Sequence, residues 1–314
     1  MLTPLPEPTD TDAMTFRQFL AVVEIRTKVV SVSTTLLASL YVVHRTGRLD
    51  PLRAALMFAA TLLIDMGTTG FNTVFDFSHG VDSARFNREE SKVLVHEGVP
   101  WGRALLVSVS LFVLALPLGL VLAWLSGWPL LAAGAACMAI GYFYAGGPLP
   151  ISRTPLGELF AGGTLGTVLF LIVWYVQAGW PDVRALVAAL PSGFCIAAIL
   201  TVNNTCDIDG DRAAGRRTIS VVAGRKAGES LAVLEVVLAF GLLAVVARLE
   251  SMNPWTLLVL PPALVLVAAI LTGLHRRGFR HATKGAAMGD ISRILGVFTM
   301  TMTLMLVLDL LLRP

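Results

Sequence analysis

Residues 203–212 read NNTCDIDGDR and close a long apolar run that begins near Ala185. Carboxylates held this close together repel one another unless a cation is shared among them. Asp207 and Asp211 are four positions apart, so a helix would present both on one face. The stretch therefore predicts a helix that leaves an apolar environment and carries a cluster of acidic side chains at its carboxyl end.

A similar pattern lies upstream, at the end of another apolar run. Asn72 and Asp76 have the same spacing as Asn203 and Asp207, and Asp82 follows. Two signatures of this kind predict two parts of the chain that face a single site.

The composition indicates an integral membrane protein. Of 314 residues, 55% are hydrophobic and only 14% are charged, and the mean hydropathy is +0.75. Soluble domains carry about 25% charged residues. The net charge of +3, without a stripe of basic and aromatic residues, argues against nucleic acid as a partner, and no obligate protein partner is indicated. The three cysteines, Cys137, Cys195 and Cys206, lack metal-ligand spacing and are interpreted as packing residues.

Nine apolar segments have about the length that spans a bilayer as a helix. They cover residues 17–44, 54–78, 101–125, 127–145, 156–179, 184–206, 228–248, 255–274 and 289–312. Helices are expected because lipid cannot satisfy an open backbone. We therefore predict an all-α polytopic membrane protein with nine transmembrane helices around a central cavity.

No linker long enough to separate domains is present. We expect a polar tail over residues 1–16 and one membrane domain over residues 17–314, with pseudo-repeated halves of about 17–150 and 151–314. Most of the arginines and lysines fall in loops on the side of the two acidic clusters. The positive-inside rule then predicts a cytoplasmic amino terminus and a cytoplasmic site, in a plasma or inner membrane.

Acidic clusters beside arginine and lysine favour one chemistry. Mg²⁺ prefers hard oxygen ligands and is often held by a few carboxylates together with substrate phosphates. A diphosphate neutralised in this way becomes a good leaving group. Apolar walls behind the site favour a hydrocarbon tail, so the residues point to a prenyl diphosphate.

At this level of detail the motifs resemble a known family. Asn72-x-x-x-Asp76-x-x-x-Gly80-x-Asp82 and residues 203–218, NNTCDIDGDRAAGRRT, are similar to the two Asp-rich motifs of the UbiA superfamily of intramembrane prenyltransferases. The resemblance is greatest to the 1,4-dihydroxy-2-naphthoate branch of the menaquinone pathway, and GGPLP at 146–150 and LGELF at 156–160 fit that branch. One departure is Thr73, because the family often has Asp directly after the first Asn.

The resemblance implies roles for individual residues. The residues expected to hold Mg²⁺ and diphosphate are Asp76, Asp82, Asp207 and Asp211. The residues expected to be catalytic are Asp76, Asp207, Asn72 and Asn203, with the two asparagines orienting the aspartates. The residues expected to bind substrates are Lys28, Arg85, Lys92, Tyr144, Arg153, Asn204, Arg212 and Arg216.

Several of these positions also have a structural interpretation. Lys28 lies in the first apolar segment, where a charge is usually paired or functional. Arg85 and Lys92 either close over the site or lie on a solvated surface helix, and Arg216 is equally consistent with a positive-inside anchor. Asp65 is interpreted as a polar clamp between helices or as part of the acceptor pocket. Asp209 is expected to be solvated, and Asp309 with Arg313 to form a pair at a helix end.

The expected reaction is Mg²⁺-dependent transfer of a polyprenyl group from its diphosphate to an aromatic acceptor, by resemblance 1,4-dihydroxy-2-naphthoate. Other acceptors (4-hydroxybenzoate, homogentisate, haem) or cyclisation of the prenyl chain stay open. A CDP-alcohol phosphotransferase is disfavoured because its motif is not completed after Asp209-Gly210. A transporter of an anionic lipid is a further alternative, although its site would be expected nearer the bilayer midplane.

Overall fold

The computed structural model describes residues 14–82 and 92–313, and within them the chain forms helices and no strand. The α-helices are α1 (Phe16–Val22), α2 (Val29–Thr46), α3 (Pro51–Ser78), α4 (Val93–His96), α5 (Trp101–Ser126), α6 (Pro129–Ala145), α7 (Gly157–Gly162), α8 (Leu169–Ala178), α9 (Val183–Cys206), α10 (Ile208–Ala213), α11 (Ile219–Ala223), α12 (Arg225–Leu249), α13 (Leu260–Arg277) and α14 (Lys284–Leu312). The short connecting helices are η1 (Ile25–Lys28), η2 (Ile151–Arg153), the π-helix η3 (Gly163–Val168), η4 (Pro254–Val259) and η5 (His281–Thr283).

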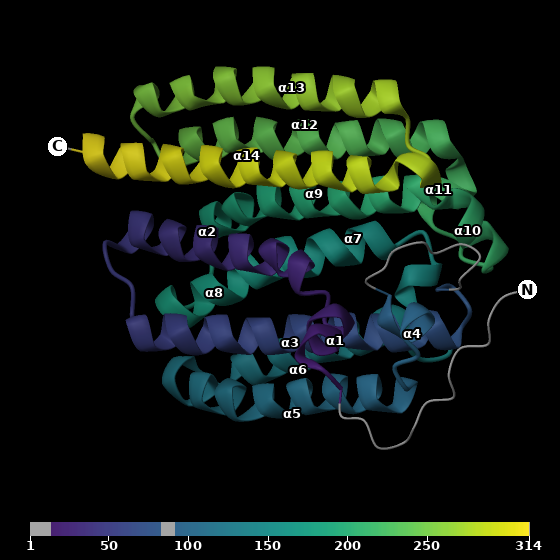
Figure 1. Ribbon diagram of the computed structural model, residues 1–314. Coiled ribbons are helices and arrows are strands. Elements are labelled where there is room, and N and C mark those ends of the chain that lie inside the picture. The colour runs from purple at the N-terminus through teal and green to yellow at the C-terminus, as the bar shows by residue number, and fades with distance from the viewer. Residues whose placement is uncertain (1–13, 83–91, 314) are drawn as a thin grey trace, which may run out of the picture.

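The long helices run side by side as a bundle, with α4, α10 and α11 gathered at one end (Figure 1). In the described residues, seven helical stretches are long and apolar enough to cross a membrane. The apolar α6 has only 17 residues, and α2, with 18 residues rich in serine and threonine, is not among the seven. The predicted class of an all-α integral membrane protein is confirmed, whereas the count of nine spans is not exact.

The first predicted segment, residues 17–44, is not one helix. The chain breaks after α1, where Glu24 adopts a left-handed backbone conformation with φ of 46°. The Thr27 hydroxyl donates to the Glu24 carbonyl at 2.9 Å, and the regular helix α2 starts only at Val29. Consequently α1 packs separately, against α3, α4 and α5. The apolar pattern missed this break because hydropathy does not report backbone conformation.

Polar caps define where the long helices begin. The Asp50 carboxylate accepts hydrogen bonds from the Leu52 and Arg53 amides ahead of α3, and Asp182 accepts from the Ala185 amide ahead of α9. Such caps satisfy amide groups that have no partner inside the helix. They start α3 and α9 at the end of the bundle that lies away from the acidic motifs.

Small residues allow the helices that carry the motifs to pack closely. Gly67 and Gly70 of α3 face Phe112 and Ser108 of α5, and a side chain at either glycine would collide with them. Close approach through small residues is a common way for helices to associate in membranes. The packing of α3 on α5, and of α9 on α12, gives both motif helices a rigid support on the side away from the centre.

Candidate functional site

A cavity of about 1510 Å³ lies at the centre of the bundle. Residues of the helices α1 to α10 and of α14 line it, whereas α12 and α13 contribute no lining residue. Glu24 and Asp65 are among its acidic lining residues, and the two motifs contribute Asn72, Asp76, Asp82, Asn203, Asp207, Asp209 and Asp211. We call the part of the molecule that carries them the acidic end. Both motifs therefore meet in one hollow, as their spacing predicted.

The first motif is shaped by the end of α3. Asn72 and Asp76 lie in its last two turns, and Gly80 then adopts a left-handed conformation with φ of 71°. Glycine occupies this region without steric cost, and it commonly ends helices in this way. The turn lets the Asp82 amide donate to the Asp76 carbonyl at 3.0 Å. It folds Asp82 back toward the helix, where its side chain joins Asp76 in the cavity wall.

The second motif uses the same device. Asp207 lies at the bend between α9 and α10, and Asp211 lies in α10. Gly215, with φ of 72°, turns the chain so that the Arg216 amide donates to the Asp211 carbonyl at 2.8 Å. The Arg216 guanidinium then donates to the Asp211 carboxylate at 3.0 Å. The turn at Gly215 thus places the Arg216 guanidinium beside the Asp211 carboxylate, five residues earlier in the chain.

Lys92 connects the amino-terminal segment to the first motif. Its ammonium lies 2.9 Å from the Glu24 carboxylate and 3.2 Å from that of Asp82. Burial disfavours the charged form, but the Glu24 and Asp82 carboxylates outweigh it and raise the pKa of Lys92 well above its usual value. Lys92 is therefore a fixed positive charge in the cavity wall.

Asp211 differs from Lys92, because its surroundings disfavour the charged form of its side chain. Burial raises the pKa of its carboxyl group to about 6, although the Arg216 guanidinium opposes the shift, and the nearby carboxylates of Asp207 and Asp76 add to it. Its Oδ2 atom is buried and has no hydrogen-bond partner in the described part of the chain, and neither has the Asn72 Oδ1 atom. These oxygens lack the donors that buried acceptors normally have.

The residues at the acidic end fit a hard divalent cation. Carboxylate and amide oxygens are the protein ligands of Mg²⁺, and two of those present lack a donor. Within residues 14–82 and 92–313, however, no three acidic, histidine or cysteine side chains converge into a ready-made metal site. The four predicted aspartates therefore do not form a complete metal site by themselves. Mg²⁺ commonly takes only some of its ligands from protein and the rest from phosphate and water, so an incomplete set of protein ligands is consistent with this metal.

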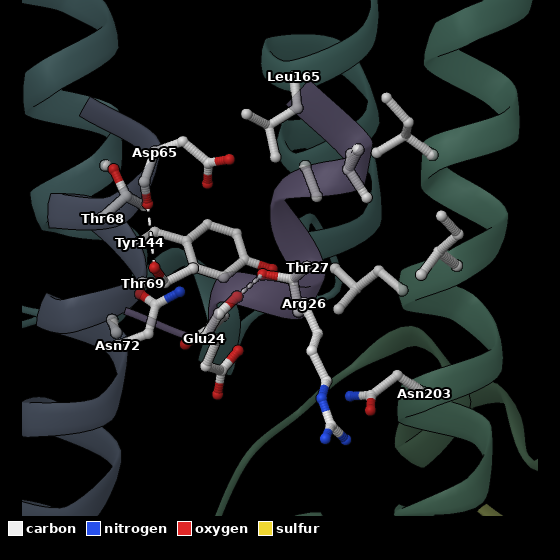
Figure 2. Close-up of a pocket in the computed structure, with 18 of the residues that line it drawn as sticks. Glu24, Arg26, Thr27, Asp65, Thr68, Thr69, Asn72, Tyr144, Leu165 and Asn203 are labelled. Atoms are coloured by element: carbon white, nitrogen blue, oxygen red, sulfur yellow. Dashed lines mark hydrogen bonds between the residues drawn. The ribbon is translucent and has the colours of Figure 1, made fainter. Parts of the chain in front are cut away.

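Deeper in the cavity, polar groups give way to apolar ones. Figure 2 shows the Tyr144 ring beside Thr68 and Asn72 of α3, and Arg26 extending from η1 toward Asn203 of α9. Beyond Tyr144, the lining side chains of α6 are Gly141, Ile140, Cys137, Gly134 and Leu130. Tyr144 to Leu130 is fourteen residues of helix, or about 21 Å at 1.5 Å per residue. The cavity therefore joins a charged mouth to a long apolar interior.

Lys28 does not face this cavity. Its buried ammonium lies 2.7 Å from the Asp65 carboxylate and also donates to the Thr69 hydroxyl at 3.0 Å. Ser31 donates to the other Asp65 oxygen at 2.5 Å. Asp65 thus forms the polar clamp between helices that was one of its two interpretations, while still touching the cavity. An unpaired charge inside the membrane is costly, and pairing with the Asp65 carboxylate lowers this cost for the buried Lys28 ammonium.

Three further predicted substrate-binding residues lie outside the lining. Arg153 donates to the Ala214 carbonyl at 2.8 Å and so ties two loops together. The Asn204 amide donates to Glu158 at 2.9 Å between α9 and α7, and Arg212 is exposed. Arg85 lies outside the described residues. Of the predicted substrate-binding set, Lys92, Tyr144 and Arg216 line the cavity.

Two cavity residues escaped the sequence analysis. Lys284 begins α14 and its ammonium lies 2.7 Å from the Asp207 Oδ2 atom, while His281 Nδ1 lies 3.2 Å from Oδ1. Arg26, in the first apolar segment, also lines the cavity and is not among the predicted site residues. The general excess of basic residues on this side was the only signal for Lys284, because no motif surrounds it.

Comparison with known proteins gives concordant results. The model of the UbiA prenyltransferase family matches residues 31–308. The 1,4-dihydroxy-2-naphthoate octaprenyltransferase of Bacillus subtilis (strain 168) is 31% identical over 225 residues, which cover 72% of this chain and 70% of that protein. The enzyme of the same name from Mycobacterium tuberculosis is 33% identical over 190 residues, 58% of this chain and 64% of that one.

Among solved structures, a UbiA homologue from Archaeoglobus fulgidus bound to GPP and Mg²⁺ superposes with a TM-score of 0.65. It is 14% identical, and the match covers 92% of this chain and 99% of the other. This likeness establishes the fold and the arrangement of the bundle.

Proposed function

Because this chain belongs to the UbiA prenyltransferase family, we propose that it transfers a polyprenyl group from a prenyl diphosphate to 1,4-dihydroxy-2-naphthoate, in the synthesis of menaquinone. The prenyltransferase class follows from the family. The acceptor, the use of Mg²⁺ and the residue roles are proposed. Family membership leaves neither a phosphotransferase nor a lipid transporter with support.

One observation above all supports this reaction: the aspartates of two distant motifs line the charged mouth of a single cavity whose interior is apolar. A prenyl diphosphate has the same polarity along its length, with an anionic head and a hydrocarbon tail. The name of the octaprenyltransferase relatives gives 1,4-dihydroxy-2-naphthoate as their acceptor, and in this chain the polar side chains around Tyr144 would receive it.

The side chains at the acidic end divide the work. Asp76, Asp82, Asp207 and Asp211 would hold Mg²⁺, which when bound would neutralise the diphosphate and so ease its departure. Lys92 and Arg216 supply fixed positive charge for the remaining phosphate oxygens. Asn72 and Asn203, one turn deeper on α3 and α9, orient the aspartates.

The chemical step then needs exclusion of water. The bond between the prenyl C1 and the diphosphate oxygen breaks, and its electron pair leaves with the diphosphate. A ring carbon of the acceptor forms the new carbon–carbon bond, and the ring loses a proton. By the resemblance, a dihydroxynaphthoate acceptor also loses its carboxyl group as CO₂. The carbon that carried the carboxyl group keeps the electron pair of the broken bond and takes up one proton, so no proton is gained or lost overall. Apolar walls of α6, α8 and α9 shield the allylic cation from water.

The test is product mass spectrometry on purified full-length protein. Labelled prenyl diphosphates, from geranyl to longer chains, are offered with 1,4-dihydroxy-2-naphthoate, 4-hydroxybenzoate, homogentisate or haem, with Mg²⁺ or EDTA. We expect a decarboxylated prenyl-naphthalenediol in Mg²⁺ only. Asp76→Asn and Asp207→Asn should each lower kcat by at least about 100-fold, on the scale of lost electrostatic stabilisation. Glu229→Gln, on α12 outside the cavity, serves as the matched control.

A product formed only with another acceptor, or a cyclised prenyl chain without acceptor, would contradict the proposed substrate while leaving the enzyme class intact. Full activity in EDTA would contradict the role given to Mg²⁺.

A further inference from the structure

Three aspartates of the cavity are each paired with a lysine or arginine side chain. Lys92 lies 3.2 Å from Asp82, and Arg216 lies 3.0 Å from Asp211. For Asp207 the cation is Lys284, at 2.7 Å. Lys92 and Arg216 already have a role as diphosphate-binding residues in the proposed function. Lys284 has the same relation to its aspartate but no role.

The surroundings of Asp207 make this contact unusual. Both of its carboxylate oxygens are engaged, Oδ2 by Lys284 and Oδ1 by His281. The Asp207 and Lys284 side chains are only 20% and 18% exposed, and both line the cavity. Lys284 is also the first residue of α14, a helix of 29 residues, where the helix dipole is already positive. A cation at this position raises the potential further and favours a bound anion.

A metal ion bound at Asp207 would alter this arrangement. A carboxylate that coordinates a divalent cation attracts a nearby ammonium less strongly, because the two cations repel. The ammonium would then be available to another anion beside it. In the same cavity, a diphosphate brings several negatively charged oxygens.

We propose that Lys284 is a substrate-binding residue that neutralises Asp207 before metal binds and pairs with the diphosphate once Asp207 takes up the metal. This inference rests on the proposed function. It makes α14, the last helix, part of the diphosphate site, although neither Asp-rich motif extends into it.

Two effects of opposite sign follow from such an exchange. Without Lys284, a metal ion competes with one cation fewer for Asp207, so metal alone binds more tightly. The diphosphate, by contrast, loses a charge-assisted partner and binds more weakly. A lysine that only stabilises the fold would not separate the two affinities in this way.

The experiment uses the full chain in lipid nanodiscs and the variants Lys284→Gln and Lys284→Arg. Binding of Mn²⁺ alone is followed by the loss of its free paramagnetic signal, and binding of geranyl diphosphate in excess Mg²⁺ by calorimetry. For Lys284→Gln we expect tighter Mn²⁺ binding, by about threefold or more, and weaker geranyl diphosphate binding, by about tenfold or more, as for one lost charge-assisted contact. Lys284→Arg should stay within about threefold of wild type in both.

Lys226→Gln is the matched control, since Lys226 is an exposed lysine near the start of α12 and lies outside the cavity lining. If Lys284→Gln binds geranyl diphosphate like wild type, or loses metal and diphosphate affinity together, the inference is wrong. If the wild-type protein binds no geranyl diphosphate in Mg²⁺, the proposed function itself fails, and the role of Lys284 fails with it.

Discussion

Neighbouring residues at the end of α3 serve different partners. Asn72 and Asp76 line the cavity, whereas the Thr73 side chain between them is buried and points to α1. Its hydroxyl donates to the Val22 carbonyl at 3.0 Å. The family often carries aspartate at this place, so the departure noted in the sequence has a packing reason here: Thr73 fastens α1 to α3 and lies outside the cavity lining.

Replacing Thr73 tests this at the residue scale. Thr73→Val leaves the buried Val22 carbonyl without its donor and should cost about 1 kcal/mol of stability. Thr73→Asp places a carboxylate against that carbonyl oxygen and should cost about 2 kcal/mol or more. Both are measured as a lower Tm at a fixed scan rate, with Thr73→Ser as the control that keeps the hydroxyl. An aspartate variant with unchanged Tm and tighter Mn²⁺ binding would show that position 73 faces the metal.

At the scale of elements, the helix formed by α7, η3 and α8 is held against α9 by glycines. Gly162 and Gly166 meet the backbone of α9 at Gly193, with no room for a side chain at either. Between them, Gly163 borders open space. The widened π-turn of η3 lies at this contact, which is also where α9 receives support from the centre of the bundle. Close backbone packing here sets the position of α9, which carries Asn203 in its last turn and leads into Asp207.

A pair of matched variants checks this contact. Gly166→Ala should force α9 away from η3 and cost about 1–3 kcal/mol, the range for overpacking. Gly163→Ala makes the same chemical change three residues earlier, in open space, and should leave Tm unchanged or slightly higher. The measurement is thermal unfolding of both variants beside wild type. Equal Tm values for the two variants would contradict the proposed packing.

For the whole molecule, the end opposite the acidic motifs is closed by a polar network. The buried Asp309 of α14 accepts from Arg313 at 2.9 Å and lies 2.8 Å from the His44 ring nitrogen of α2. Its other oxygen accepts from the Asn253 amide at 2.6 Å. The pair Asp309 and Arg313, expected from their spacing, is therefore confirmed and joins three parts of the chain. It ties the first and last long helices together far from the cavity mouth.

Asp309→Asn tests the separation of stability from binding. Loss of the charge weakens the hydrogen bonds that Asp309 accepts from the partly exposed Arg313 guanidinium and from the Asn253 amide, and should cost about 1–3 kcal/mol. We expect a clearly lower Tm but a Kd for geranyl diphosphate in Mg²⁺ that stays within about twofold, since single-site effects rarely couple over long distances. A variant with wild-type Tm would contradict the structural role, and one with normal Tm and lost binding would move Asp309 into the site.

The depth of the cavity has a consequence for substrate choice. Gly134 lies on the lining face of α6, ten residues or about 15 Å from Tyr144. A Cβ atom added there would meet nothing within 4 Å, so a side chain can begin at this position without a clash.

Gly134→Trp should therefore shorten the usable cavity. We expect kcat/KM for geranyl diphosphate to stay within about threefold of the wild-type value. For the longest accepted chain, kcat/KM should fall at least about tenfold, because contact between the Trp side chain and the end of the tail would cost about 1–3 kcal/mol. Product mass spectrometry with a mixture of chain lengths measures the shift. Gly241→Trp is the control. Gly241 is exposed on α12 outside the cavity, and a Cβ atom added there would also meet nothing within 4 Å. An unchanged chain-length profile would place the tail elsewhere.

Much of this protein follows from its sequence alone. Long apolar runs determine helices, because a backbone in lipid must satisfy its own hydrogen bonds. The positions of Asp76 and Asp207 at the ends of two such runs follow from local spacing, as does the meeting of Asp207 and Asp211 on one side. These features depend on residues within a few turns of one another, and a local pattern reports them directly.

Other features were decided only by the tertiary structure. The contacts of Asp207 with His281 and Lys284, of Lys28 with Asp65, and of Thr73 with Val22 join elements far apart in the chain. Each depends on which helix faces lie together, and that is set by packing over the whole bundle. Lys284 would have the same local sequence pattern whether its side chain faced solvent or, as it does, an aspartate 77 positions away. The break after α1 was likewise invisible, because a left-handed turn at Glu24 leaves the hydropathy pattern unchanged.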